Sequence, residues 1–529
     1  MTAGIAMPPS CILVCMRAGN EHAIKTKNMA TTLMTPGVYI EEKNAFPNSA
    51  VAVETSLPVF IGYTAKAERN SKSLLHESVR IASFAEYVEL FGTGFKPQFT
   101  IAPAAAGQLK NVFLIDGKPS VLQVNPNNTF YLYNCMRLFF ANGGGDCYIL
   151  SVGTYGDKQD GLEIAMDDFI GSDTKPNPFD TLDKEYEPTL VVAPDIIALG
   201  EAAYAFYEQV LLHCSKVQSR FGIFDIAYQN PDQTIEEVTQ AFRDKIGINF
   251  LNYGAVYYPW LRTSIVQPSE IDFENFDAAV DLEALLPEAA AKDVVRKFKV
   301  LPPDQVNDTT RRNYHQSLKS SSIVYNHLLD EVRSRLNELP PSPAMAGIYN
   351  LVDSSRGVWK APANVSVGMV NEPMWNVSHD QQQNLNVDRM AGKSINVIRP
   401  FPGIGTLVWG ARTLDGNSQD WRYINVRRTL IMLEQSLKLA ARNYVFEPND
   451  SSTWITLKGM FNNFLFNYWR LGALAGAVPD QAYDVQVGLG STMTPNDILD
   501  GIMRISVKVA IVHPAEFIVI TFQQQQQQS

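Results

Sequence analysis

The sequence predicts a mixed α/β chain of several domains, with a helix-flanked β-sheet core, inserted outer domains, and extended N- and C-terminal β-strand arms. Between residues 189 and 260, short apolar runs alternate with amphipathic stretches, a pattern typical of a largely parallel sheet covered by helices. The 529 residues, 46% hydrophobic and 19% charged, have the composition of a globular protein of about three or four domains. A segment just before the glutamine tail is apolar on both faces, which predicts a terminal strand.

The charge and the cysteine content exclude several classes of protein. Asp and Glu outnumber Lys and Arg by 55 to 44, which gives a net charge of -11. An acidic chain of this kind is a poor candidate for general nucleic-acid binding. The cysteines are too irregularly spaced for a zinc site or a thiol-exchange motif, so we expect reduced thiols. They are Cys11, Cys15, Cys135, Cys147 and Cys214.

The first 28 residues differ from the rest of the chain. Their apolar stretch, Cys11 to Met16, has no Lys or Arg ahead of it, whereas a signal peptide begins with a basic region. We therefore expect residues 1-28 to be a disordered leader or an over-extended gene start, with Met29 or Met34 as the initiator.

The N-terminal half is expected to supply most of the sheet. A turn at Asp116-Gly117 between two apolar runs predicts a β-hairpin. Helices are predicted over residues 197–219 and 235–246, between strands. The predicted strands occupy residues 38–40, 58–61, 147–152, 190–193, 222–226 and 255–258.

The C-terminal half combines an exposed insertion with a second core-like region. Residues 265 to 340 are more charged, mostly helical in pattern and flanked by prolines, which indicates an inserted segment. A Gly-rich strand region then covers residues 395–410, and long helices are predicted over 426–444 and 452–476. Charged and amide side chains interrupt the second helix, so we expect a buried helix there rather than a membrane span.

No residue spacing in the chain indicates catalysis, a cofactor or a metal. The seven histidines form neither an HExxH nor an HxH pattern. The loop Asn142 to Asp146 lacks the GK[ST] ending of a phosphate-binding loop, and Gly488 to Thr492 lacks the GxSxG pattern of a nucleophile elbow. We therefore do not expect an enzyme. The alternative of a soluble α/β enzyme whose residues meet only in the folded chain stays open.

The last strands carry the first informative feature. Apolar residues alternate regularly over residues 503 to 511, and residues 516 to 522 are apolar on both faces. A strand of this kind at the end of a chain has to be covered, because otherwise it is an adhesive edge. Two interpretations fit: a central strand of the chain's own sheet, or a strand donated to a neighbouring subunit.

The second informative feature is a basic segment in an acidic chain. Residues 399 to 442 carry seven Lys or Arg against three Asp or Glu, a local net charge of +4. On the predicted helix from residue 426, apolar residues repeat at helical spacing and a polar ridge follows a similar period. We interpret the ridge either as a solvated face or as a docking face for an acidic partner. Its members are Arg428, Gln435, Lys438 and Arg442.

Several sequence blocks occur in an order that resembles one known family. They are TPGVYIEE at residues 35–42, YYPW at 257–260, the segments 344–364, 396–414 and 421–450, and HPAEFIVITF at 513–522. Together they resemble the contractile tail sheath proteins of phage tails and of phage tail-like contractile injection systems. Residues 100 to 130 and 265 to 340 match no block of that family and look like insertions.

The resemblance implies a structural protein. Sheath subunits form stacked six-membered rings in a helical polymer around an inner tube, and their terminal arms pair with strands of neighbours. Contraction, triggered by the baseplate, drives the tube through a target envelope without nucleotide hydrolysis. The implied partners are further copies of the chain, the inner tube protein, the baseplate and terminal cap proteins, and any paralogous sheath proteins. No nucleic acid, membrane insertion, cofactor or metal is expected.

The resemblance also assigns roles to residues. The helix that begins near Arg427 is expected to face the inner tube, so the candidates for tube contact are Arg428, Lys438 and Arg442. The residues expected to pair between subunits are Val38, Tyr39, Ile40, Glu41, Glu42, Phe517, Ile518, Val519, Ile520, Thr521 and Phe522.

The expected domain division follows from these blocks. It comprises the leader (1-28), an N-terminal arm (29-56), the N-terminal part of the core (57-99 and 131-264), a hairpin insertion (100-130), a helical insertion (265-343), the C-terminal core (344-502), the C-terminal arm (503-522) and the glutamine tail (523-529). A type VI secretion sheath component is a further alternative, but both family-like ends lie on this one chain, whereas that sheath is split over two. The subunit is expected in the bacterial cytoplasm during assembly. It is then expected in a phage tail or a tail-like particle, which is released or anchored at a membrane.

Overall fold

The computed structural model describes residues 50–105, 108, 111–124, 129–155, 163–228 and 233–520. These residues all belong to the unit Asn48–Ser529. Four predicted segments lie outside the described residues: the leader, the strand at residues 38–40, the last two residues of the C-terminal arm (Thr521 and Phe522) and the glutamine tail.

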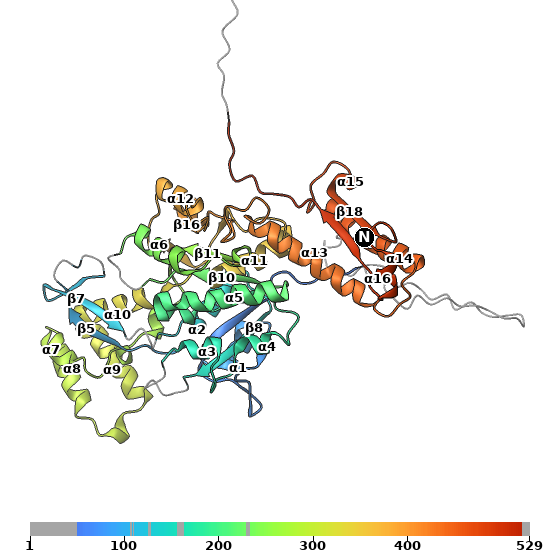
Figure 1. Cartoon of the computed structure of the whole chain (residues 1–529). Helices are drawn as coiled ribbons and strands as arrows, with labels where there is room; N and C mark the ends of the chain where they lie inside the picture. Colours follow the sequence, from blue (N-terminus) through green and yellow to red (C-terminus); the bar gives the residue numbers. More distant parts are fainter. Residues whose placement is uncertain are drawn as a thin grey trace, which may run out of the picture. The chain divides into compact units, whose positions relative to one another are not determined.

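A nine-stranded sheet forms the centre of the fold (Figure 1). Its order is β14-β17-β16-β11-β10-β9-β1-β8-β4. The strands from β16 to β8 run parallel, and β4, β17 and β14 join antiparallel at the two edges. The bounds are β1 (Pro58–Thr64), β4 (Ser78–Ile81), β8 (Cys147–Thr154), β9 (Leu190–Val192), β10 (Phe221–Asp225), β11 (Gly254–Tyr258), β14 (Val365–Ser366), β16 (Asn396–Phe401) and β17 (Gly405–Val408).

The apolar runs form parallel strands, as predicted, because both faces of the sheet are covered. Val59 and Ile61 of β1 pack in one hydrophobic cluster, whereas Phe60 between them packs in another. Successive side chains of a strand point to opposite faces, so a strand buried on both faces needs apolar residues throughout.

Helices on each face complete these two cores. The helices α5 (Ala203–Val217) and α6 (Ile235–Lys245) contribute to the first cluster. On the other face lie α2 (Leu132–Ala141) and α11 (Ser342–Arg356). The predicted helices are confirmed, but the one expected from residue 197 starts later, because Gly200 has a φ of +63° and separates α5 from a preceding 3₁₀ segment.

The segments predicted as insertions share one hydrophobic core. The predicted hairpin turn is confirmed: Asp116 and Gly117 both have positive φ, as a two-residue type I′ turn requires. Phe99, directly ahead of the first of these segments, bridges to Phe276 of the second. The elements are β5 (Phe99–Pro103), β6 (Phe113–Ile115), β7 (Lys118–Val124), α7 (Leu282–Leu285), α8 (Ala289–Lys299), α9 (Asp308–Ser321) and α10 (Ile323–Leu336).

A third region consists of a helix pair and a two-stranded ribbon. The helices α13 (Ile424–Arg442) and α14 (Ser451–Arg470) pack with β18 (Tyr483–Val487) and β19 (Ile505–Val509) around a common core. Helix α14 ends earlier than the predicted residue 476. Gly472 takes a φ of +85°, and the backbone N–H groups of Gly472 and Ala473 bond back to Trp469 and Tyr468, which closes the helix in a Schellman motif.

Candidate assembly surface

The ribbon of β18 and β19 presents two open edges. The strands pair antiparallel with each other, from Tyr483 opposite Val509 to Val487 opposite Ile505. No other described strand joins either of them. One side of the ribbon packs on the helix pair through the buried Val485. A two-stranded ribbon is marginally stable alone, and its free backbone groups are a template for a further strand.

After β19 the chain is tied to the subunit by backbone contacts. The carbonyl of Ala510 accepts from the N–H of Ala475 at 2.7 Å, and the N–H of Val512 donates to Ala473 at 3.2 Å. The carbonyl of Val512 accepts from Asn425 Nδ2 at 3.1 Å. These bonds hold the chain to the end of α14 and the start of α13 as far as Val512.

Four residues further on, the carboxylate of Glu516 is held by three side chains. Arg412 donates from Nε to Oε1 at 3.0 Å and from Nη2 to Oε2 at 2.6 Å. Asn386 Nδ2 donates to Oε1 at 2.7 Å, and the hydroxyl of Tyr423 donates to Oε2 at 3.1 Å. The side chains of Arg412 and Glu516 are only 5% and 19% exposed, so this is a largely buried, bidentate ion pair.

The electrostatics of Glu516 favour the charged carboxylate. Burial by itself raises the pKa of Glu516, but the hydrogen bonds from Arg412 and Asn386 and the charge of Arg412 outweigh it. The pKa of Glu516 therefore lies below its ordinary value.

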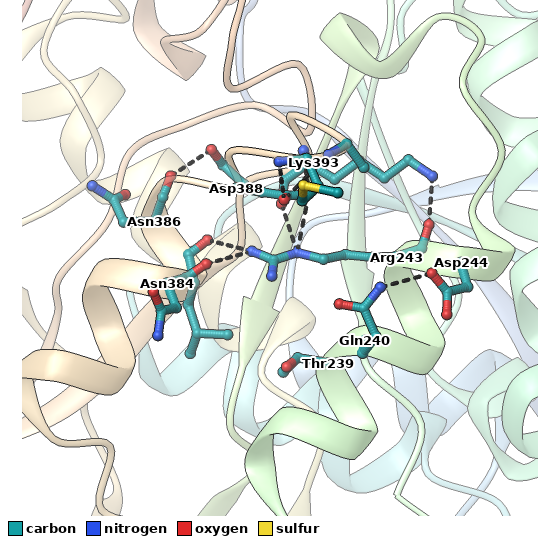
Figure 2. A network of polar contacts seen from close by, with 12 residues as sticks. Thr239, Gln240, Arg243, Asp244, Asn384, Asn386, Asp388 and Lys393 are labelled. Atoms are coloured by element: carbon teal, nitrogen blue, oxygen red, sulfur yellow. Dashed lines mark hydrogen bonds and ion pairs between the residues drawn. The ribbon is translucent and has the colours of Figure 1, made fainter.

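A second polar network fixes the partner Asn386 (Figure 2). Arg243 of α6 is buried and donates to the carbonyls of Asn384 and Leu385 in α12 (His379–Asn386) and of Lys393. Asp388 accepts from three backbone N–H groups of the same loop. Residues 384–393 are thereby held against α6, with Asn386 at the edge that faces Glu516.

Immediately after Glu516 the chain leaves the subunit surface. Phe517, Ile518, Val519 and Ile520 are 71%, 79%, 88% and 71% exposed, respectively. None of them is in a strand of the described part of the chain. The interpretation of this segment as a central strand of the chain's own sheet is therefore wrong for residues 516–520. Four consecutive exposed apolar side chains indicate a surface that is covered by something else.

The basic residues of α13 divide into a buried and an exposed group. Arg428 is 3% exposed; it donates to Asp353 at 3.0 and 2.5 Å and to the carbonyl of Thr55 at 2.9 Å, and stacks on the ring of Tyr349. The expectation that Arg428 belongs to an exposed ridge is wrong, because the N-terminal turns of α13 are buried on all sides. Lys438 and Arg442 are exposed.

Lys438 and Arg442 line a groove of about 940 Å³ beside the C-terminal half of α13. Leu439 and Val445 contribute apolar surface next to them, and both are at least half exposed. No acidic side chain within the described ranges forms an ion pair with Lys438 or Arg442. The groove thus combines apolar surface with Lys438 and Arg442, and four acidic residues line it as well: Glu54, Asp183, Glu185 and Glu187.

The histidine and the cysteines that could carry chemistry elsewhere in the fold are buried inside the subunit. Nε2 of His213 lies 2.5 Å from Nη1 of Arg220, and burial followed by the charge of Arg220 lowers the pKa of His213 to about 4. Cys135, Cys147 and Cys214 are buried free thiols, as predicted, and burial raises the pKa of each. The other two cysteines lie outside the described residues.

Within the parts of the chain that the structure describes, no three His, Cys, Asp or Glu side chains are grouped so as to hold a metal ion. None of the helices found there has the length and apolar character that crossing a membrane requires.

Sequence reasoning did not identify Glu516 or its partners as a site. Arg412 is one of the seven bases counted between residues 399 and 442. Glu516 is the first residue of the segment 516–522, which the pattern predicts to be an apolar strand. The available signal was a single carboxylate directly ahead of four apolar residues, a place where a charge needs a specific partner.

Comparisons with known proteins relate the part of the chain that carries this surface to a known family. Residues 417–525, which include both α13 and the exposed segment, match the family model for the phage tail sheath C-terminal domain. A tail sheath protein of Vibrio phage KVP40 is 25% identical over 176 residues, 33% of this chain and 25% of that protein. The chain therefore matches about a quarter of the length of this curated relative.

Two solved structures are similar over nearly the whole chain. A chain of the PVC sheath complex, an extracellular contractile injection system in its contracted state, is 28% identical, with a TM-score of 0.59 over 94% of this chain and 99% of that chain. A chain of the contracted helical sheath of the anti-feeding prophage is also 28% identical, with a TM-score of 0.58 over 93% and 99%.

Proposed function

We propose that the chain is a structural subunit of a contractile tail sheath, because residues 417–525 match the family model for the phage tail sheath C-terminal domain and solved sheath structures are similar over nearly the whole chain. Copies of the chain polymerise as stacked six-membered rings in a helix around an inner tube. Contraction of this polymer drives the tube through a target envelope. The subunit is a mechanical element, and no enzymatic step is part of the proposal.

The observation that carries this proposal is the pairing of a donor and an acceptor on one chain. The donor is the segment Phe517–Ile520, which is apolar and exposed. The acceptor is the ribbon of β18 and β19, whose outer edges are open among the described strands. When a donor fits the acceptor of the next copy, contacts are head-to-tail and generate rings or helices. The N-terminal segment Val38–Glu42 is proposed as a second donated strand.

A polymer linked in this way can change its packing without coming apart. Backbone pairing through extended arms holds neighbours together, while the folded bodies rotate and slide as rigid units between two packed arrangements. The free energy for driving the tube then comes from the difference between these two arrangements.

The remaining partners are assigned on charge and on similarity to the sheath family. We assign contact with the inner tube to Lys438 and Arg442, because both are exposed on the groove and neither forms an ion pair among the described residues. Arg428 is engaged with Asp353 inside the subunit. Baseplate and terminal cap proteins bind the ends of the polymer. The subunit assembles in the bacterial cytoplasm and works in a phage tail or a tail-like particle.

Electron microscopy of two shortened chains tests the proposal. A chain that stops after His513 lacks the donor, whereas a chain that stops after Phe522 lacks only the glutamine tail and serves as the control. Negative-stain images of the full chain and of the control, with the tube protein present, are expected to show striated hollow cylinders. The chain that stops after His513 is expected to give single particles. Cylinders from that chain, or none from the full chain with its tube protein, would contradict the proposed function.

A further inference from the structure

We propose that the Glu516 carboxylate is the fixed pivot of the C-terminal arm, and that Arg412, Asn386 and Tyr423 position the arm for capture by the next subunit. The inference rests on the proposed function and names the residues that govern strand donation. Glu516 is thus a positioning residue, since the apolar residues after it make the contact itself.

Glu516 lies at a sharp boundary between held and free chain. It is the last described residue with a hydrogen bond to the body of the subunit, through Asn386, Arg412 and Tyr423. The next four residues are all more than two-thirds exposed. The direction in which the arm leaves the surface is therefore set at this residue.

The three partners come from separate parts of the fold. Asn386 ends α12, Arg412 follows β17, and Tyr423 precedes α13. Arg412 also donates to the carbonyl of Asn386 at 3.3 Å, and Arg243 donates to the carbonyls of the two residues before it, Asn384 and Leu385 (Figure 2). Because several rigid segments converge on one carboxylate, the pivot has a defined position relative to the sheet.

A fixed pivot shortens the free arm. With Glu516 held, six residues of the arm follow it up to Phe522; without it, the last tie is at Val512, which ten residues of the arm follow. The effective concentration of a tethered segment falls roughly as the −3/2 power of the tether length, so this lengthening lowers it about twofold. Losing the fixed exit direction lowers it further.

Two variants test the pivot without shortening the arm. Glu516→Gln keeps the size of the side chain but loses the charge, and leaves Arg412 unpaired. The double variant R412Q/E516Q removes both charges, so that no buried charge is left without a partner. The control is Lys297→Gln on α8, whose side chain is 75% exposed and whose Nζ lies 2.6 Å from a carboxylate oxygen of Asp293. It removes one exposed, paired charge that belongs neither to the arm nor to the ribbon, and it leaves the pivot intact.

The first readout is amide hydrogen exchange at Ala510 and Val512 in the unassembled full chain, because their N–H groups donate to Ala482 and Ala473 and anchor the chain just before the pivot. Both pivot variants are expected to exchange faster there, with no change in the strands of the nine-stranded sheet. The second readout is the rate of polymer growth by light scattering, with the tube protein present. It is expected to fall about twofold or more in both pivot variants and to stay unchanged in the control.

The outcomes separate this inference from the proposed function. Unchanged exchange at Ala510 and Val512, or polymer growth as fast as or faster than wild type in both pivot variants, overturns the pivot. If the wild-type chain forms no polymer even with its tube protein, the proposed function fails. The exchange measurement then still decides whether Glu516 holds the arm.

Discussion

At the residue scale, the buried carboxylate of Asp225 shows how its surroundings set the pKa of a side chain. Asp225 ends β10 with 1% of its surface exposed, and its carboxylate accepts from the backbone N–H of Ser342 at 2.8 Å and from the Ser342 hydroxyl at 2.5 Å. Asp225, at the end of strand β10, therefore caps the N-terminus of helix α11. Only these two donors offset its loss of water, so burial raises the pKa of Asp225 to about 7.

This raised pKa predicts the pH dependence of stability. The folded chain binds the proton of Asp225 more tightly than the unfolded chain, in which the pKa is about 3.9. The stabilising contribution of the protonated acid is thus fully present below about pH 4 and is lost as the pH rises towards 7. Asp225→Asn keeps both contacts without titrating. It is expected to remove a slope of up to about 1.4 kcal/mol per pH unit from the free energy of unfolding between pH 4 and 7.

Urea unfolding of wild type and Asp225→Asn at several pH values, at concentrations below assembly, measures this slope. Asp500→Asn, at an exposed position after α16 (Pro495–Leu499), is the matched control and is expected to leave the slope unchanged. An identical pH dependence in wild type and Asp225→Asn would show that Asp225 is ionised in the folded chain.

At the element scale, helix α14 contains a glycine that the subunit does not require. Gly459 lies in the middle of the helix, and a Cβ added there meets no atom within 4 Å. Two residues beyond the end of the helix, Gly472 has a φ of +85° and closes the C-terminal Schellman motif. The same residue type is therefore dispensable at one position and required at the other.

The two glycines predict opposite effects of one substitution. Gly459→Ala is expected to raise the free energy of unfolding by about 0.5–1 kcal/mol, because alanine loses less backbone entropy in a helix. Gly472→Ala is expected to lower it by about 1 kcal/mol, because alanine is strained at positive φ. Urea unfolding of the two variants beside wild type checks both signs. A loss of stability in Gly459→Ala would mean that the middle of α14 is packed more closely than the structure has it.

At the scale of the whole molecule, the proposed assembly divides the surface between further copies of the chain and a second partner. In this proposal the exposed apolar arm and the ribbon edges make the contacts between copies. Lys438 and Arg442 are exposed on the groove beside α13, and we propose that these two charges meet an acidic surface of the tube. Self-association and tube binding should thus be separable by mutation.

The double variant K438E/R442E is expected to lose co-sedimentation with the inner tube protein, because both free charges reverse sign. The two substitutions leave the C-terminal arm unchanged, so the variant is expected to keep its stability and to pair with other copies as the wild type does. Tube binding by the wild type is also expected to weaken as salt screens the charges. The control K297E/R312E reverses two exposed charges on α8 and α9, away from the groove. Undiminished tube binding by K438E/R442E would place the tube contact elsewhere.

The sequence by itself determined the parts of the fold that depend on near neighbours in the chain. Continuous apolar runs predicted β1, β9, β10 and β11, because a strand buried on both faces has no polar positions. The pair Asp116-Gly117 predicted its hairpin, because only a few residues adopt positive φ twice in succession. The order of the family-like blocks likewise indicated a sheath subunit.

Tertiary structure alone decided which charges are buried and where the arm leaves the subunit. Arg428 and Lys438 have the same spacing pattern on α13, yet Arg428 is buried against Asp353, 75 residues away in sequence, and Lys438 is exposed. Glu516 is held by Arg412 from 104 residues away. Periodicity fixes the face of a helix on which a residue lies, whereas burial and ion pairing depend on which distant segment packs against that face.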